Sequence, residues 1–196
     1  MKKDTTIIRK YAEAKPELKI DIICKYYPQL DSIIDAGIAG MKFIICEERA
    51  RNQRAEYGEL GVRVQSGRDY SDPTASEGCF YADLENAIRS CDFSGNLLDG
   101  IEHPGKIIEE AHILREMKEI RDLYDLQIAC LRATDRVLYQ RYLNQEMTIS
   151  DIASEYQIEY HSAAKKISRI RKYVNRGVIA TMKLTSCQHG TKSMRR

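Results

Sequence analysis

Mostly apolar residues recur at alternating steps of four and three positions from Ile113 to Leu131, within the segment 106–131. An α-helix has 3.6 residues per turn, so this spacing places them on one face and predicts a long amphipathic helix. The same spacing forms an a/d seam, which either packs against helices of the same chain or joins two copies of it. The seam comprises Ile113, Met117, Ile120, Tyr124, Gln127 and Leu131.

Two earlier segments also have the pattern of helices. The segment 30–57 has an apolar stripe at three–four spacing, and its far end is densely charged. A second helix is expected from Pro73 to about residue 91, with Asp72 capping its first turn. The chain of 196 residues has no Trp and only 4 Pro, which also favours helices. We therefore expect an all-α fold. The stripe in 30–57 comprises Ile33, Ile34, Gly37, Ile38, Met41, Ile44, Ile45 and Glu48.

Charge is distributed unevenly along the chain. In total there are 31 Lys and Arg against 29 Asp and Glu, a net charge of +2. The segment 160–196 holds ten Lys or Arg and no acidic residue, which leaves 21 basic and 29 acidic residues in 1–159, a net of −8. An acidic body followed by a basic segment predicts a polyanionic partner, with a solvated basic tail as the plain alternative.

The C-terminal segment has the pattern of three short helices ending in a basic one. Thr148 and Asp151 form a T-x-x-D capping pattern, so a second helix is expected to start there. We expect Ile152 and Tyr156 to face inward, and Ile158 to plug a tight turn. Together these features predict a C-terminal helix-turn-helix, whose last helix lies in the major groove of DNA. Its inward-facing residues are Ala163, Ile167 and Ile170.

Candidate DNA-binding residues lie on the exposed positions of this unit. Polar side chains at the start of the last helix are placed to read base edges, and later Lys and Arg to neutralise phosphates. The start of the second helix is placed to donate to one phosphate. The base-reading candidates are Tyr160, His161, Ser162 and Lys165, the backbone candidates are Lys166, Arg169, Arg171 and Lys172, and the helix-start candidates are Thr148 and Ser150.

The segment "LYQRYLNQEMTISDIASEYQIEYHSAAKKISRIR", residues 138–171, resembles DNA-binding region 4 of sigma-70-type factors. It also resembles the C-terminal part of phage late-transcription regulators of the ArpU and RinA type. The resemblance implies that Ile152, Ala153, Ile158 and Ile167 are core residues and that 160–169 is the recognition helix. Two positions depart from the pattern. Gln157 stands where Gly is usual in the turn, which predicts a strained backbone there, and Glu159 stands where Ser or Thr is usual.

These features divide the chain into three parts. Residues 1–131 form a helical body for oligomerisation or partner binding, 132–180 a helix-turn-helix DNA-binding domain, and 181–196 a flexible basic tail. The expected function is sequence-specific regulation of transcription at a promoter, of phage or prophage type. The expected partners are double-stranded DNA, RNA polymerase and further copies of the chain. The alternatives are a phage DNA-packaging protein of the terminase small-subunit type, or a basic helical pair that serves a protein partner.

Several classes of protein are not indicated. The chain has no GxxxxGK[ST], GxSxG, HExxH or GxGxxG motif, so we expect no enzyme and no cofactor. The six cysteines form no CxxC, and His103 and His112 are nine residues apart, so no metal site is expected. The chain has no long apolar run and its N-terminus lacks the apolar core of a signal peptide, so a cytoplasmic location without a membrane partner is expected.

Overall fold

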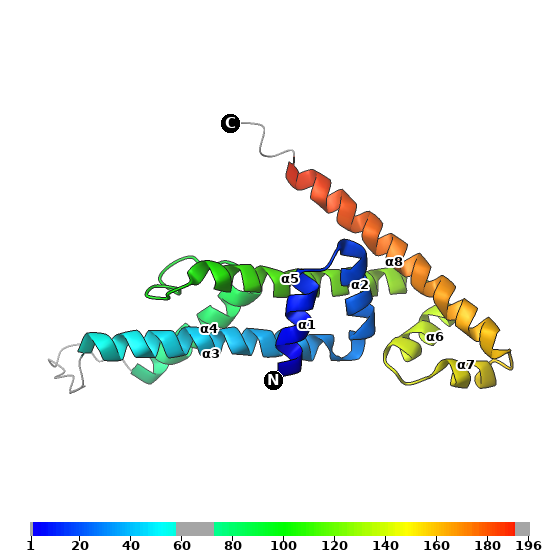
Figure 1. Cartoon of the computed structure of the whole chain (residues 1–196), viewed down its shortest axis with the longest axis horizontal. Helices are drawn as coiled ribbons and strands as arrows, with labels where there is room; N and C mark the ends of the chain where they lie inside the picture. The colour runs from blue at the N-terminus through cyan, green and yellow to red at the C-terminus, as the bar shows by residue number, and fades with distance from the viewer. Residues whose placement is uncertain (1, 58–72, 191–196) are drawn as a thin grey trace. The chain divides into compact units, whose positions relative to one another are not determined.

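The computed structural model describes residues 2–57 and 73–190, and within these ranges the chain forms helices and no strand. This confirms the all-α prediction. Several bounds agree with the sequence patterns, and the predicted cap Asp72 lies outside the described residues. The elements, shown in Figure 1, are α1 (Lys2–Ala12), α2 (Pro16–Lys25), the short 3-10 helix η1 (Tyr27–Gln29), α3 (Leu30–Tyr57), α4 (Pro73–Ser90), α5 (Pro104–Ala129), α6 (Ala133–Leu143), α7 (Ile149–Glu155) and α8 (Tyr160–Gly190).

The helices pack as two compact units that do not follow chain order. The first unit comprises Met1–Ile8 and Ser32–Glu116, and the second comprises Arg9–Asp31 and Met117–Arg196. This differs from the division after residue 131 that the sequence suggested. Helix α2 belongs with the C-terminal helices because Ile20 and Ile23 are fully buried and α2 contacts α8.

The core of the first unit is built on the apolar face of α3. Most of the predicted stripe is buried, whereas Ile44 is 47% exposed, because the buried row follows Met41 and Ile45 instead. Gly37 is part of this face, and a Cβ atom there would lie 2.9 Å from Leu114 of α5. The absence of a side chain at Gly37 thus allows α3 and α5 to approach closely. The buried stripe residues are Ile33, Ile34, Ile38, Met41 and Ile45.

The core of the second unit contains the later part of the predicted seam. Met117, Ile120 and Tyr124 are buried within the chain, which favours the intrachain use of the seam over self-association. The buried face then continues through Ile128 rather than through the half-buried Gln127. In this core the Tyr124 and Tyr139 hydroxyls are hydrogen-bonded at 2.6 Å, which satisfies two polar groups that burial would otherwise penalise.

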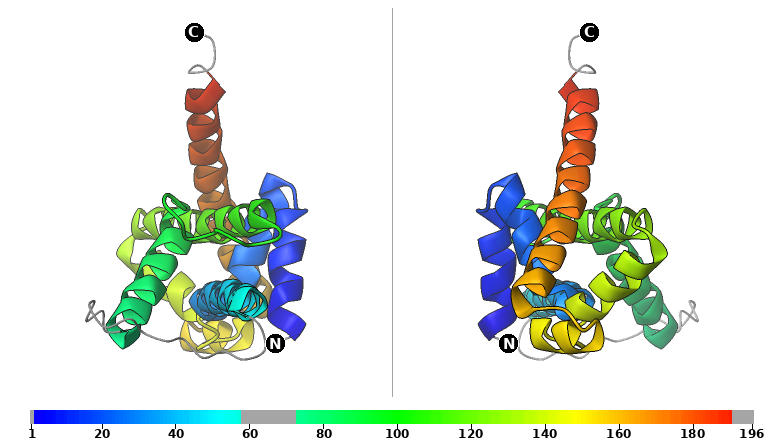
Figure 2. Two further views of the ribbon diagram at one scale, coloured as in Figure 1. Left: turned by 90° about the vertical axis from the view of Figure 1, so that its left-hand side faces the viewer. Right: turned by 90° about the vertical axis from the view of Figure 1, so that its right-hand side faces the viewer.

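Helix α8 is longer than the sequence suggested. The apolar face formed by Ile167 and Ile170 continues with the buried Val174 and Val178, so the helix has a packing surface well beyond its first turns. It runs to Gly190, so 181–190 are helical rather than part of the expected flexible tail, and 191–196 lie outside the described residues. Figures 1 and 2 show α8 as one continuous helix that starts beside α7.

Candidate nucleic-acid interface

Helices α6, α7 and the start of α8 pack together within the second unit (Figures 1 and 2). Their shared core contains Leu143 of α6, Ile152 of α7, and Ala163 and Ile167 of α8, all buried. The apolar spacing assigned Ile152, Ala163 and Ile167 to the interior, as observed. Burial of large side chains on facing helices stabilises such a unit by roughly 1.5–3 kcal/mol per side chain.

The predicted capping box at the start of α7 is confirmed. The Asp151 backbone N–H donates to the Thr148 hydroxyl at 3.3 Å, and the Thr148 backbone N–H donates to the Asp151 carboxylate at 2.8 Å. The backbone hydrogen bond from Thr148 lowers the pKa of the Asp151 carboxyl, and the Thr148 hydroxyl adds to this effect. Thr148 is therefore engaged in its own cap, whereas Ser150 is exposed at the helix start.

The turn between α7 and α8 is closed by backbone hydrogen bonds. The N–H of Ile158 donates to Ala153 at 3.0 Å, and the N–H of Gln157 donates to Ser154 at 3.3 Å. This is the Schellman arrangement, which requires a left-handed residue after the helix. Gln157 supplies it with φ of +51°, as the absence of Gly at this position predicted.

Two side chains at this turn do not lie where the sequence placed them. Tyr156 is 40% exposed and Ile158 is 36% exposed, so the prediction that both face the core is wrong. The reason is that the backbone bonds close the turn and the left-handed Gln157 redirects the chain, so no apolar plug is needed. The Lys166 ammonium instead lies over the Tyr156 ring, 5.1 Å from the ring centre.

Ion pairs connect α6 to the two following helices. Arg141 of α6 donates to both carboxylate oxygens of Glu155 at 3.0 and 3.2 Å. Lys166 of α8 pairs with Asp135 of α6 at 3.3 Å. These pairs are partly exposed and each contributes about 0–1 kcal/mol, so their main effect is to orient the helices.

Two of the candidate phosphate contacts therefore face the chain itself. Lys166 is half-buried against Asp135 and Tyr156. Arg171 donates to Asp21 of α2 at 2.8 Å, across 150 residues of sequence. Neither cation is free to neutralise a phosphate without giving up a partner within the chain.

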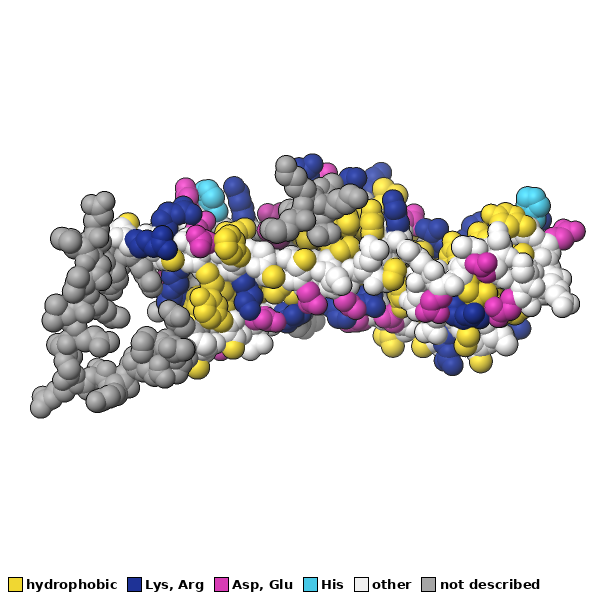
Figure 3. Space-filling model, turned by 90° about the horizontal axis from the view of Figure 1, so that it is seen from below, with side chains coloured by type: hydrophobic (Ala, Val, Ile, Leu, Met, Phe, Trp, Pro, Cys, Tyr) yellow, Lys and Arg dark blue, Asp and Glu magenta, His cyan; other side chains and the backbone are white. Residues whose placement is uncertain are grey.

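The other candidates on α8 lie on its outer surface. Tyr160 is 53% exposed, and the basic residues among these candidates have no ion-pair partner within the described part of the chain. Hydrophobic side chains lie beside charged ones over α6 and α7 on the right of Figure 3. The outward-facing candidates are Tyr160, His161, Ser162, Lys165, Arg169 and Lys172.

Sequence reasoning missed two basic residues that extend this surface. Arg176 and Lys183 are exposed on α8 and, within the described residues, have no ion-pair partner. They follow Lys172 by four and eleven positions, which keeps them on the same face of a helix. The spacing was available in the sequence, but only the length of α8 shows that the helix continues through both.

A depression of about 610 Å³ lies beside this surface, between α2, the α6–α7 connection and α8. Asp21 and Lys25 line it from α2, and Arg171 lines it from α8. Because Asp21 already pairs with Arg171, its lining combines both signs of charge. The depression therefore adds little to a surface for a polyanion.

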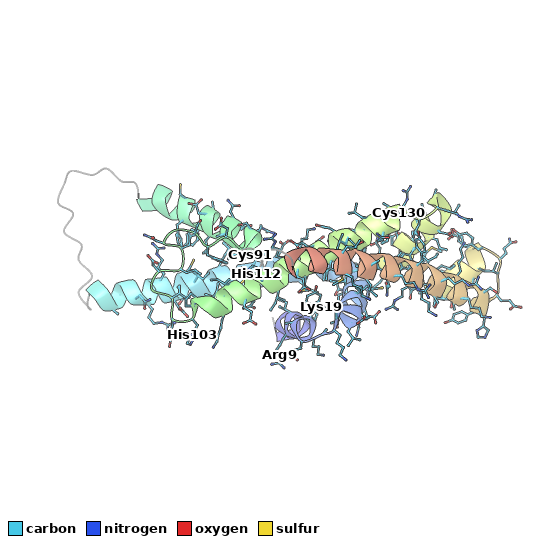
Figure 4. All side chains as sticks on the ribbon, turned by 90° about the horizontal axis from the view of Figure 1, so that it is seen from above. Arg9, Lys19, Cys91, His103, His112 and Cys130 are labelled. Atoms are coloured by element: carbon cyan, nitrogen blue, oxygen red, sulfur yellow. The ribbon has the colours of Figure 1, made fainter. Side chains whose placement is uncertain are left out.

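Other sites are not indicated within the described residues. No three His, Cys, Asp or Glu side chains come together there in a way that could hold a metal. Cys91 and His103, labelled in Figure 4, lie in the α4–α5 connection, and His112 lies in α5. The described helices include none that is both long and apolar enough to cross a bilayer.

Comparisons with protein-family models, with curated proteins and with solved structures found no match to this chain.

Proposed function

We propose that the protein binds double-stranded DNA through α7 and α8 and acts as a sequence-specific transcriptional regulator. The observation on which this depends most is the exposed basic surface of α8, whose Lys165, Arg169 and Lys172 have no ion-pair partner within the described residues. Lys and Arg that neutralise phosphates supply most of the affinity of such proteins. Oligomers with two copies of this unit would bind two half-sites.

The start of α8 supports sequence reading. Tyr160, His161 and Ser162 are exposed next to Lys165, so donors, acceptors and an aromatic ring lie together on the helix's first turns. Base edges in the major groove are distinguished by such groups. The capped α7 and the hydrogen-bonded turn brace this end of α8, since both use backbone contacts that hold it in one orientation.

The regulatory part of the proposal depends on the resemblance to sigma region 4. That resemblance implies action at a promoter, with RNA polymerase as a candidate partner. The remaining helices, mostly in the first unit, supply surfaces that such a partner or a second copy could use.

The experiment that tests this proposal is selection of bound fragments from random double-stranded DNA at two salt concentrations. A recurring motif that persists at the higher salt is the expected result, and its symmetry gives the number of reading units. Uniform binding that collapses with salt would instead mean that only charge is used, and DNA packaging would replace promoter regulation as the best interpretation.

A pair of variants assigns the binding to α8. Lys165→Ala with Arg169→Ala should make the negative slope of log K against log salt shallower by about 1.8, because each lost phosphate contact removes about 0.9 from its steepness. Arg51→Ala with Arg54→Ala is the matched control, since these cations on α3 are also exposed and without a partner within the described residues. An unchanged slope in the α8 variant would contradict the proposal.

A further inference from the structure

Five basic residues form a straight row along the outer face of α8. Successive members are separated by four, three, four and seven positions, which at 3.6 residues per turn places all of them within an arc of about 60°. At 1.5 Å per residue, the first and last lie about 27 Å apart along the helix axis. The members of this outer row are Lys165, Arg169, Lys172, Arg176 and Lys183, all of them exposed.

The outer row is opposite the face that holds α8 in its unit. The buried residues Ile167, Ile170, Val174 and Val178 recur at the same helical spacing, on the other side of the helix. No member of the outer row pairs with an acidic group within the described residues, and the sequence of α8 contains no Asp or Glu. The row therefore makes no ion pair that would help this unit to fold.

Like charges three and four positions apart on a helix repel each other by roughly 0.2–0.5 kcal/mol per pair. The outer row thus weakens the isolated helix slightly, and a polyanion laid along it removes this repulsion. A row of this kind suits a partner that carries closely spaced negative charges over a similar length. A DNA duplex meets this requirement, with one negative charge per ~1.7 Å of its axis when both strands are counted.

The length of the row distinguishes two ways in which α8 can meet DNA. The major groove is about 8.5 Å deep, so a helix that enters by its N-terminus alone contacts DNA with about six residues. Arg176 lies about 17 Å and Lys183 about 27 Å beyond Lys165 along the axis, outside that reach. A helix that lies along the duplex brings the whole row within reach of backbone phosphates.

We propose that α8 lies along the duplex and that its entire outer row contacts the sugar–phosphate backbone. This inference rests on the proposed DNA binding and adds Arg176 and Lys183 as phosphate contacts outside the recognition segment. It also assigns Lys165, which the sequence pattern placed among the base-reading candidates, to the backbone. The stretch of DNA protected by the protein is then longer than contacts from the recognition segment 160–169 alone would protect. It also means that two of the five backbone contacts of the row, and about 1.8 of the steepness of log K against log salt, come from Arg176 and Lys183.

The test compares three double variants of the full chain on the same duplex. They are Arg176→Ala with Lys183→Ala, Lys165→Ala with Arg169→Ala, and the control Arg51→Ala with Arg54→Ala. Binding is measured across a salt series, and the protected length is measured by hydroxyl-radical footprinting. Circular dichroism checks folding, and Gln in place of Ala at 176 and 183 serves as a second pair if helicity changes.

We expect the slope of log K against log salt to become shallower by about 1.8 for each of the two α8 double variants, and to stay unchanged for the control. The footprint should shorten at one edge in the Arg176→Ala with Lys183→Ala variant, and it should keep its length in the other two variants. A shallower slope confined to the 165/169 pair would overturn the inference and leave the proposed function standing. If neither pair changes the slope, the proposed function fails as well. An equal loss on single-stranded RNA and on the duplex would also overturn the inference, because the row would then serve any polyanion.

Discussion

Helices α3 and α8 are the two longest of the described elements, and they resemble each other on one face and differ on the other. Each buries an apolar stripe, and each has a glycine where a Cβ atom would meet a neighbouring helix, Gly37 in α3 and Gly177 in α8. Their polar faces differ in whether the charged side chains form ion pairs within the chain.

On α3, Lys42 pairs with Glu85 at 2.7 Å, and Asp35 pairs with Arg89 at 3.1 Å. The outer row of α8 has no such pairs within the described residues. Charged residues in the first unit are thus paired across helices, whereas those of the outer row have no ion-pair partner within the described residues. The comparison separates positions that should affect stability from those that should affect binding.

Charge reversal gives the largest expected difference between the two helices. Lys165→Glu with Arg169→Glu should weaken DNA binding on the order of 100-fold, because like charges placed together at an interface cost several kcal/mol. The melting temperature should stay close to that of the native chain. Fluorescence anisotropy with a labelled duplex and a thermal melt measure both quantities.

The matched reversal on α3 should have the opposite outcome. Lys42→Glu places a carboxylate beside Glu85, so it should lower the melting temperature and leave DNA affinity unchanged. A loss of affinity in this variant, with folding intact, would show that the first unit also contacts DNA and would break the comparison.

The glycines of α3 give the next largest effects, with opposite signs. Gly37→Ala should destabilise the chain by about 1–3 kcal/mol, since the new Cβ atom meets Leu114 at 2.9 Å and Ile8 at 3.1 Å. Gly40→Ala should stabilise it by about 1 kcal/mol, because nothing lies within 4 Å and Ala favours the helix. Chemical denaturation measures both, and equal signs would mean that the contact at Gly37 is looser than described.

The glycine of α8 sharpens this result. A Cβ atom at Gly177 would meet the Gln127 side chain, which is longer and more flexible than Leu114 and can move aside. We therefore expect Gly177→Ala to cost less than Gly37→Ala in the same denaturation experiment. A larger cost would show that Gln127 is held in place.

The strained turn before α8 predicts a smaller gain. Gln157→Gly should stabilise the chain by about 1 kcal/mol, since Gly adopts a positive φ without the cost that a Cβ atom imposes. Gln140→Gly is the control: this position is exposed within α6, and Gly there should lower stability by about 0.5–1 kcal/mol. If both variants lower the melting temperature, the side chain of Gln157 contributes more than its backbone strain costs.

The smallest expected effect is a pH dependence at the start of α7. The pKa of Asp151 is lowered in the folded chain by the hydrogen bonds from Thr148, so the capping box stabilises α7 above the unfolded pKa. This stabilisation is lost as pH falls through the folded value. Asp151→Asn should therefore reduce the dependence of the free energy of unfolding on pH in the acid range. An unchanged dependence would mean that the Asp151 carboxylate does not stabilise the start of α7.

Much of the fold follows from local patterns. The bounds of α3, the start of α4 at Pro73, the capping box of Thr148 and the left-handed Gln157 were all expected, because each depends on residues within one or two helical turns. The exposure of Tyr156 and Ile158 was not, since their spacing is the same whether a side chain or the backbone closes the turn.

The candidate site divides in the same way. The sequence places Lys165, Arg169 and Lys172 on one helical face, because helical spacing alone determines which side chains are neighbours on a helix. Only the tertiary structure decides that Lys166 and Arg171 are engaged by Asp135 and Asp21. Their partners lie 31 and 150 positions away in the chain, so no local pattern can identify them. Which cations remain available to a partner is therefore set by long-range packing, since it is packing that brings the distant carboxylates within reach.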